Sequence, residues 1–296
     1  MYWIVAWLVI VHTQGNALTF DRTAYTQMVG KIYTTYADDA ETLVEVGQEH
    51  DIGLEEMMQA NPHIDDPWEL NSYDELTIPA LFILPSAPQK GIVINLAEMR
   101  LYYYPPNEVQ TYPISIGIEG WGTPITTATV IEKVKNPTWH VPTSIRAASA
   151  AEGNPLPKII RPGPRNPLGK YALKLSAPGY LIHGTLTAHS IGQRSSHGCM
   201  RLWDKDIKIL FEEVPIGTFV RIIHESFKVA LDGNTVYLEA HEPLSDHRQD
   251  ANSQLIAIAR AISLLTGDNP FELNWEKTQQ VAQESRGIPT AIGTML

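Results

Sequence analysis

The spacing of hydrophobic residues divides the chain into three parts, of which the first is partly helical. Two runs of helical spacing, at 43–50 and 54–58, are followed by a short expected strand at 75–79. The second run ends at Asn61-Pro62, because proline cannot continue a helix. This pattern predicts a small α+β domain over residues 21–82.

The second part is predicted to be mainly β. Residues 83–90 contain two prolines and little periodicity, so we expect a linker there. Residues 91–225 are rich in short β-branched and aromatic runs separated by Gly and Pro. One clear helix is expected to begin with Asp204 as its N-cap and to end before Pro215. The expected strands are 92–94, 101–104, 112–118, 126–134, 171–175, 180–183 and 219–223.

Two further segments complete the pattern. Residues 145–170 are rich in Pro and Gly without periodicity, which predicts an irregular lid or binding loop. Residues 226–296 combine a hairpin-like turn at 232–234 with two helical runs, 255–262 and 275–286, and so predict a C-terminal α/β subdomain. We expect Gly267 and Gly287 to follow these helices as C-terminal caps.

The N-terminus is typical of an exported protein. An apolar stretch from Tyr2 to Val11 is followed by polar and small residues up to Ala17, which predicts a signal peptide at residues 1–17. A buried N-terminal strand or helix is the alternative, since no Lys or Arg precedes the apolar stretch. The stretch is too short to span a bilayer, and no later segment reaches that length, so no integral membrane segment is expected in the mature chain.

Composition argues against one class of partner and draws attention to the single cysteine. The chain carries 33 acidic and 22 basic residues, a formal net charge of −11, which argues against nucleic acid as a general partner. Its only cysteine, Cys199, cannot form an internal disulfide. An unpaired thiol in an oxidising compartment is normally either buried or used. The small and polar neighbours of Cys199, over 193–202, favour a nucleophile over an inert core residue.

A thiol nucleophile needs a base, because a free thiol is only slightly ionised at neutral pH. A histidine could take the proton and then stand as a cation beside the sulfur. His197 lies two residues before Cys199 and His183 lies sixteen residues before it, and spacing alone does not choose between them. Gly198 would let the backbone approach a substrate, so that amides near 197–199 could face a developing oxyanion; an ordinary tight turn is the alternative.

The motif around Cys199 resembles a known family. Ser196-His197-Gly198-Cys199-Met200-Arg201, preceded by His183-Gly184-Thr185, is similar to the signature of the L,D-transpeptidase catalytic domain, also called the YkuD domain. The resemblance covers residues 91–225 and extends more weakly over the whole chain, in the manner of the periplasmic ErfK/YbiS/YcfS/YnhG group. It implies a YkuD-type β-sandwich or barrel with one main helix, and a periplasmic location.

The resemblance also implies roles for individual residues. Cys199 would be the nucleophile and His183 its general base, and the Gly184 carbonyl would orient the imidazole. His197, Gly198 and Cys199 would supply oxyanion-hole amides and shape the pocket. The remaining motif residues would support the substrate, and they are Ser196, Thr185 and Arg201.

The first part of the chain is similar to a second kind of domain. Glu41-Thr42-Leu43 and Leu76-Thr77-Ile78-Pro79 resemble a LysM module, a small β-α-α-β domain that binds N-acetylglucosamine chains. The Gly-Asp turn that usually precedes Thr-Leu is replaced here by 38–41. Glycan binding by residues 21–82 is therefore one hypothesis, and a purely structural module is the other.

The expected reaction is that of a cysteine acyltransferase without a metal or organic cofactor. The thiolate would attack a tetrapeptide stem of peptidoglycan, release D-Ala and form a thioacyl enzyme. The resolving amine would come from diaminopimelate, giving a 3-3 cross-link, or from a lysine of an outer-membrane lipoprotein, giving anchoring; water would instead give a carboxypeptidase or a hydrolase. Carbapenems are expected to acylate Cys199.

Two other classes of function compete with this one. A zinc hydrolase would use Cys199 with His183, His189 or His197, although their spacing matches no ligand pattern. A non-catalytic glycan-binding wall protein would keep Cys199 as a structural residue.

Overall fold

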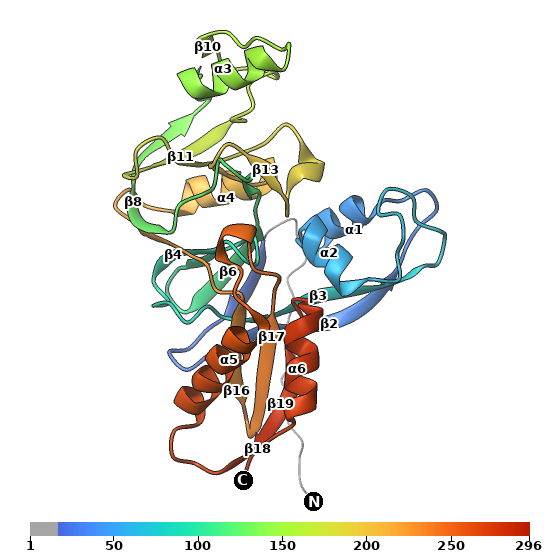
Figure 1. Cartoon of the computed structure of the whole chain (residues 1–296). Helices are drawn as coiled ribbons and strands as arrows, with labels where there is room; N and C mark the ends of the chain where they lie inside the picture. Colours follow the sequence, from blue (N-terminus) through green and yellow to red (C-terminus); the bar gives the residue numbers. More distant parts are fainter. Residues whose placement is uncertain (1–16) are drawn as a thin grey trace, which may run out of the picture.

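A nine-stranded sheet forms the centre of the protein in the computed structural model, which describes residues 17–296 (Figure 1). Nearly all of the expected signal peptide, residues 1–16, lies outside the described residues. The strand order is β1-β6-β5-β4-β15-β8-β11-β12-β14. The strands are β1 (Leu18–Asp21), β4 (Gly91–Asn95), β5 (Arg100–Tyr104), β6 (Glu108–Pro113), β8 (Thr126–Lys135), β11 (Tyr171–Leu175), β12 (Leu181–His183), β14 (Met200–Arg201) and β15 (Phe219–Ile223).

This sheet is covered on both faces. Along β4 and β5, alternate side chains belong to two different hydrophobic clusters: Ile92 and Tyr103 face the core of the catalytic part, whereas Val93 and Tyr102 face the first part of the chain. Because successive side chains of a strand point to opposite faces, a strand buried on both sides is apolar throughout. Helix α4 (Asp204–Glu213) packs through Ile207 and its neighbours into the first of these clusters.

Residues 91–225 form most of the expected strands and the main helix, but the strand expected at 112–118 is divided between β6, which begins already at Glu108, and the short β7 (Ile116–Gly117). Two short pairings add to the large sheet: β7 (Ile116–Gly117) with β13 (Arg194–Ser196), and β9 (Trp139–His140) with β10 (Ile159–Ile160). A short 3₁₀ helix, η1 (Ala188–Ser190), precedes β13. Helix α4 begins one residue earlier than expected, because Trp203 is the N-cap and Asp204 is the first helical residue.

Residues 145–170 were predicted to be irregular throughout, and the structure differs from that prediction. They include most of helix α3 (Thr143–Ala151), which with β10 projects from the far end of β8 and β11 (Figure 1). Four of the last five residues of α3 are alanine, the residue with the highest helix propensity. The prolines that dominate this stretch all follow the helix, from residue 155 onward.

The first unit is a β-α-α-β arrangement of β2 (Met28–Tyr36), α1 (Leu43–Glu49), α2 (Leu54–Ala60) and β3 (Glu75–Ile83), with β2 and β3 antiparallel. Thr42 caps α1 in a capping box with Glu45. The hydrophobic core of this unit is continuous with the outer face of the central sheet through Val93 and Tyr102. The unit is therefore packed onto the catalytic part, beside the linker that was expected to separate them (Figure 1).

The C-terminal subdomain is α/β, as predicted. Its sheet has the order β16-β17-β19-β18, with β16 (Phe227–Asp232), β17 (Thr235–Ala240), β18 (Phe271–Leu273) and β19 (Thr290–Met295). Helices α5 (Ala251–Thr266) and α6 (Trp275–Glu284) pack on it, and a short 3₁₀ helix, η2 (Ser245–His247), precedes α5 (Figure 1). Gly267 caps α5 as expected, but α6 ends at Ser285 in the left-handed region, with φ of 47°, rather than at Gly287.

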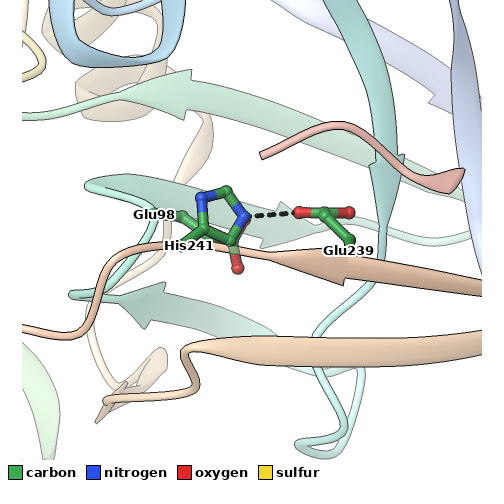
Figure 2. Close-up of side chains that lie close together, drawn as sticks. All are labelled: Glu98, Glu239 and His241. Atoms are coloured by element: carbon green, nitrogen blue, oxygen red, sulfur yellow. Dashed lines mark hydrogen bonds and ion pairs between the residues drawn. The ribbon is translucent and has the colours of Figure 1, made fainter. Parts of the chain in front are cut away.

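A buried ionic cluster joins all three parts. Lys228 lies 2.9 Å from Glu98 and 2.7 Å from Glu239, and the N–H of Ile83, at the end of β3, donates to Glu239 at 2.7 Å. His241 contacts the same carboxylate (Figure 2).

No helix among residues 17–296 is long and apolar enough to cross a membrane.

Candidate active site

Two neighbouring parallel strands bring Cys199 and His183 to the same face of the sheet. Strands β12 and β14 pair in the register Ile182 with Met200 and His183 with Arg201. Ile182 and Met200 are fully buried in the core of the catalytic part, so both point to the core face. Because side chains alternate along a strand, His183, one residue after Ile182, points to the opposite face, and we expect the same of Cys199, which directly precedes β14. Adjacent strands lie about 4.8 Å apart, which places the two side chains as diagonal neighbours.

His183 is held as a neutral imidazole. Its Nδ1 lies 2.6 Å from the carbonyl oxygen of Gly184, and a carbonyl can only accept, so Nδ1 carries the proton and donates it. Burial and, to a smaller extent, the charge of Arg201 lower the pKa of His183 to about 4, while the backbone carbonyls of Gly184 and Leu168 act in the opposite direction. At neutral pH, Nε2 is therefore unprotonated.

Cys199 is half-buried on the same face, with its Sγ 3.7 Å from the carbonyl oxygen of Gly179. Burial raises the pKa of the Cys199 thiol, while the backbone N–H of Leu181 and the charge of Arg201 act in the opposite direction. The sequence argument expected an ion pair of thiolate and imidazolium. In this conformation burial disfavours both charges, so the pair rests as a neutral thiol and a neutral imidazole.

A tight turn before Cys199 is held by two hydroxyl groups. Ser196 Oγ accepts from the N–H of Gly198 at 3.0 Å and donates to the carbonyl of Cys199 at 2.6 Å. Thr123 Oγ1 donates to the carbonyl of Gly198 at 2.8 Å and accepts from the N–H of Gly117 at 3.0 Å. The sequence analysis missed Thr123, because it lies 76 residues from Cys199 in a loop without a motif of its own.

Gly198 has a different role from the one expected. Its φ is +105°, a conformation that favours glycine, and an added Cβ would lie 3.0 Å from the ring of Tyr180. Its N–H is already used by Ser196 within the turn, whereas the expectation was an amide that faces the substrate. Among the described residues, the N–H of Cys199 donates to no protein acceptor. That group is the available donor for an oxyanion.

The other motif residues surround this pair. Arg201 Nη1 donates to the carbonyl of Ser195 at 3.0 Å, and its Nε is buried and has no partner within residues 17–296. His197 is exposed, and its ring stands edge-on to Trp121 with 5.0 Å between ring centroids. Thr185 is buried and its Oγ1 accepts from the N–H of Thr187, so it orders the turn after β12.

The residues proposed as zinc ligands are not among the groups of three whose ligand atoms come together within residues 17–296. The ring of His189 packs edge-on against Trp68 of the first unit. Within the described part of the chain, one group of three residues, Glu98, Glu239 and His241, could hold a metal ion (Figure 2). Its two carboxylates are already bridged by the ammonium of Lys228, and the group lies in the ionic cluster at the junction of the three parts.

Comparisons with known proteins point to one family. Residues 89–222 match the model of the L,D-transpeptidase catalytic domain, close to the 91–225 expected from the sequence. The chain is 40% identical to the probable L,D-transpeptidase YcfS of Escherichia coli K12, over 86% of this chain and 81% of that protein. It is 39% identical to ErfK/SrfK of the same organism, covering 90% and 88%, and 44% identical to YbiS, covering 74% and 73%. Both are also described as probable L,D-transpeptidases.

A solved structure of an L,D-transpeptidase from Mycobacterium tuberculosis H37Rv overlaps 51% of this chain and 63% of its own, with 18% identity and a TM-score of 0.35.

Proposed function

The chain belongs to the L,D-transpeptidase family, and we propose that it transfers the acyl group of a peptidoglycan tetrapeptide stem to an amine through a thioester on Cys199. The observation that carries the proposal is the register of β12 against β14, which brings Cys199 next to the strand of a histidine whose Nε2 is unprotonated at neutral pH. A nucleophile, its base and a group that orients the base are what acyl transfer requires.

In the first half of the proposed reaction, Nε2 of His183 takes the thiol proton as Sγ attacks the carbonyl carbon of the third residue of the stem. The N–H of Cys199 donates to the oxyanion that develops. The carbon–nitrogen bond to D-Ala then breaks, and the proton on His183 passes to the leaving amine. The product is a thioester of Cys199 and free D-Ala.

In the second half, an amine attacks the thioester carbonyl, His183 accepts a proton from the amine, and the departing sulfur recovers a proton. We propose diaminopimelate of a second stem or a lysine of an outer-membrane lipoprotein as the amine, while water would make the enzyme a carboxypeptidase. By the same chemistry, Sγ would attack the carbonyl carbon of the strained β-lactam ring of a carbapenem. The ring would open and leave Cys199 acylated. No step of this scheme requires a metal or an organic cofactor.

Glycan strands are a second proposed partner. The β-α-α-β order of the first unit and its exposed aromatic residues, among them Tyr36 and Tyr73, support a LysM-like module that binds N-acetylglucosamine chains. We also propose that the protein acts in the periplasm after export, on the basis of residues 1–17 and its E. coli relatives.

The test is incubation of the protein with disaccharide-tetrapeptide muropeptides, with and without a lysine-ended lipoprotein peptide, followed by mass spectrometry. Loss of D-Ala with a dimer supports cross-linking, loss with a peptide adduct supports anchoring, and loss with neither supports hydrolysis. No loss of D-Ala and no change of protein mass would rule out the proposed activity.

A further inference from the structure

Helix α2 of the first unit is joined by its backbone to the catalytic part. The N–H of Leu54 donates to the carbonyl of Ile191 at 3.2 Å, and the N–H of Glu55 donates to the carbonyl of Gly192 at 3.3 Å. The first N–H groups of a helix have no acceptor within the helix, so these two donors are free to bind elsewhere. The approach is close: at Gly192, whose φ is +81°, an added Cβ would collide with Gly53 and Leu54.

The bound segment leads directly to Cys199. The N–H of Gly192 donates to the carbonyl of Ile114 at 3.2 Å, and the carbonyl of Gln193 accepts from Ile116 at 3.1 Å. Residues 194–196 follow as β13, and Ser196 closes the turn at Cys199 with its hydroxyl. The segment that α2 holds is thus separated from the nucleophile by a single short strand and a hydrogen-bonded turn.

Helix α2 is itself held at both ends. Near its start, Glu56 forms two hydrogen bonds of 2.7 Å with the fully buried guanidinium of Arg100 on β5. At its end, Arg286 of the C-terminal subdomain donates to the carbonyls of Gln59 and Ala60, at 3.3 and 2.8 Å. A short helix fixed in this way can hold the segment it contacts in place, because neither end moves without breaking polar contacts, which are buried at its start and partly buried at its end.

We infer that α2 is a positioning element of the active site, in which the N–H groups of Leu54 and Glu55 hold residues 191 and 192 and so set the place of Cys199 relative to His183. The inference rests on the proposed function for its kinetic consequence. It assigns the first unit a role in catalysis that is separate from any binding of glycan. It also assigns the C-terminal subdomain a part in holding α2, because Arg286 binds the carbonyls at the end of that helix.

A matched pair of variants isolates one of these hydrogen bonds. Leu54→Pro removes the N–H that reaches Ile191, while Leu54→Ala removes the same buried side chain and keeps the N–H. Proline is tolerated at the first position of a helix, and Gly53, with ψ of 159°, has the extended conformation that proline requires of its predecessor. Any difference between the two variants therefore reports mainly the backbone contact.

The measurements are kcat and KM for D-Ala release from a disaccharide-tetrapeptide, and the rate of Cys199 alkylation by iodoacetamide against pH. We expect kcat of Leu54→Pro to fall about fivefold or more below that of Leu54→Ala, with KM unchanged, since small displacements of a nucleophile are costly. The alkylation profile is expected to shift as well. Equal kcat and equal alkylation profiles in the two folded variants would overturn the inference.

Two further comparisons keep the test decisive. If Leu54→Pro does not fold, Arg286→Gln replaces it, with Arg260→Gln on the exposed face of α5 as its control; equal kcat and alkylation in that pair overturns the inference. If the wild-type protein releases no D-Ala, the proposed function fails. Alkylation of the only cysteine still tests the positioning role, because it requires no turnover.

Discussion

The candidate active site and the junctions between the three parts both bury ionisable groups, with opposite results. At His183 and Cys199 burial outweighs the other influences, so the pKa of the histidine falls to about 4 and that of the thiol rises although Arg201 acts to lower it. Lys228 is buried between Glu98 and Glu239, and the attraction of these carboxylates raises its pKa despite burial. Burial alone therefore does not decide the charge state of a group; its partners do.

This difference matches the two tasks. A histidine that acts as a general base must be neutral to accept a proton. A nucleophilic thiol can remain protonated until it reacts if a neutral base lies close enough to accept its proton. A junction between three parts of a chain instead needs a contact that is specific in geometry. The Arg100–Glu56 pair and the Lys228 cluster meet that need, because each leaves a buried charge without a partner if the parts separate.

Cys199→Ala gives the largest expected effect on activity with the smallest effect on the fold. D-Ala release should fall by a factor of at least about 10³, because no other nucleophile replaces the thiol. Thermal unfolding should stay near that of the wild type, since Sγ makes only one long contact to Gly179. Mass spectrometry of the products and calorimetry measure the two effects. Residual turnover above about a tenth of the wild-type rate would remove Cys199 from the proposed mechanism.

His183→Ala should be nearly as damaging, whereas His197→Ala should only reduce the rate. His183 is buried on the face of Cys199, while His197 is exposed and packs on Trp121. In the wild type, kcat/KM should fall as the pH drops through about 4, because protonated His183 cannot accept the thiol proton. Complete loss in His197→Ala with activity retained in His183→Ala would reverse the assignment of the base.

Lys228→Met tests the junction. It leaves Glu98 and Glu239 buried without their cation, and breaking a buried pair in this way typically costs about 3–5 kcal/mol of unfolding free energy. Lys208→Met, on the exposed face of α4, is the control and should change stability little. Urea unfolding measures both. Equal stabilities for the two variants would show that the cluster does not hold the parts together.

The last expected effect, that of Asp206→Asn, depends on pH. Burial, with the nearby charge of Asp51, raises the pKa of Asp206 to about 8, and neither oxygen of its carboxyl group has a partner within residues 17–296. An acid whose pKa is raised by folding costs stability above its unfolded pKa, about 3.9, and the cost stops growing above about 8. The variant should match the wild type near pH 4 and melt a few degrees higher near pH 8.

The control for this prediction is Asp232→Asn, an exposed aspartate at the end of β16 that should show no such trend. A gain in melting temperature that is the same at pH 4 and pH 8 would contradict the titration of Asp206 as its cause. A pH-dependent gain would show that Asp206, like His183 and Cys199, is a buried group that is kept neutral.

Local patterns in the sequence were sufficient for most strands of the central sheet, for helix α4 and for the motif around Cys199, because periodicity, turn residues and the chemistry of a thiol are expressed by neighbouring residues. They missed β1 (Leu18–Asp21) and β14 (Met200–Arg201). The same patterns missed helix α3, because the proline and glycine residues that follow it in the sequence were taken to indicate an irregular loop despite the alanine-rich run before them. They also left His183 and His197 equivalent as bases, and only the family resemblance favoured His183.

Tertiary structure decided what depends on residues far apart in the chain. The register of β12 against β14 placed His183 on the face of Cys199, and burial in that pairing set both groups neutral. The contact of α2 with Ile191 and Gly192 joined the first unit by backbone hydrogen bonds to the segment that leads to Cys199. These features arise from the pairing of backbones and from exclusion of water, neither of which is expressed in a short stretch of sequence.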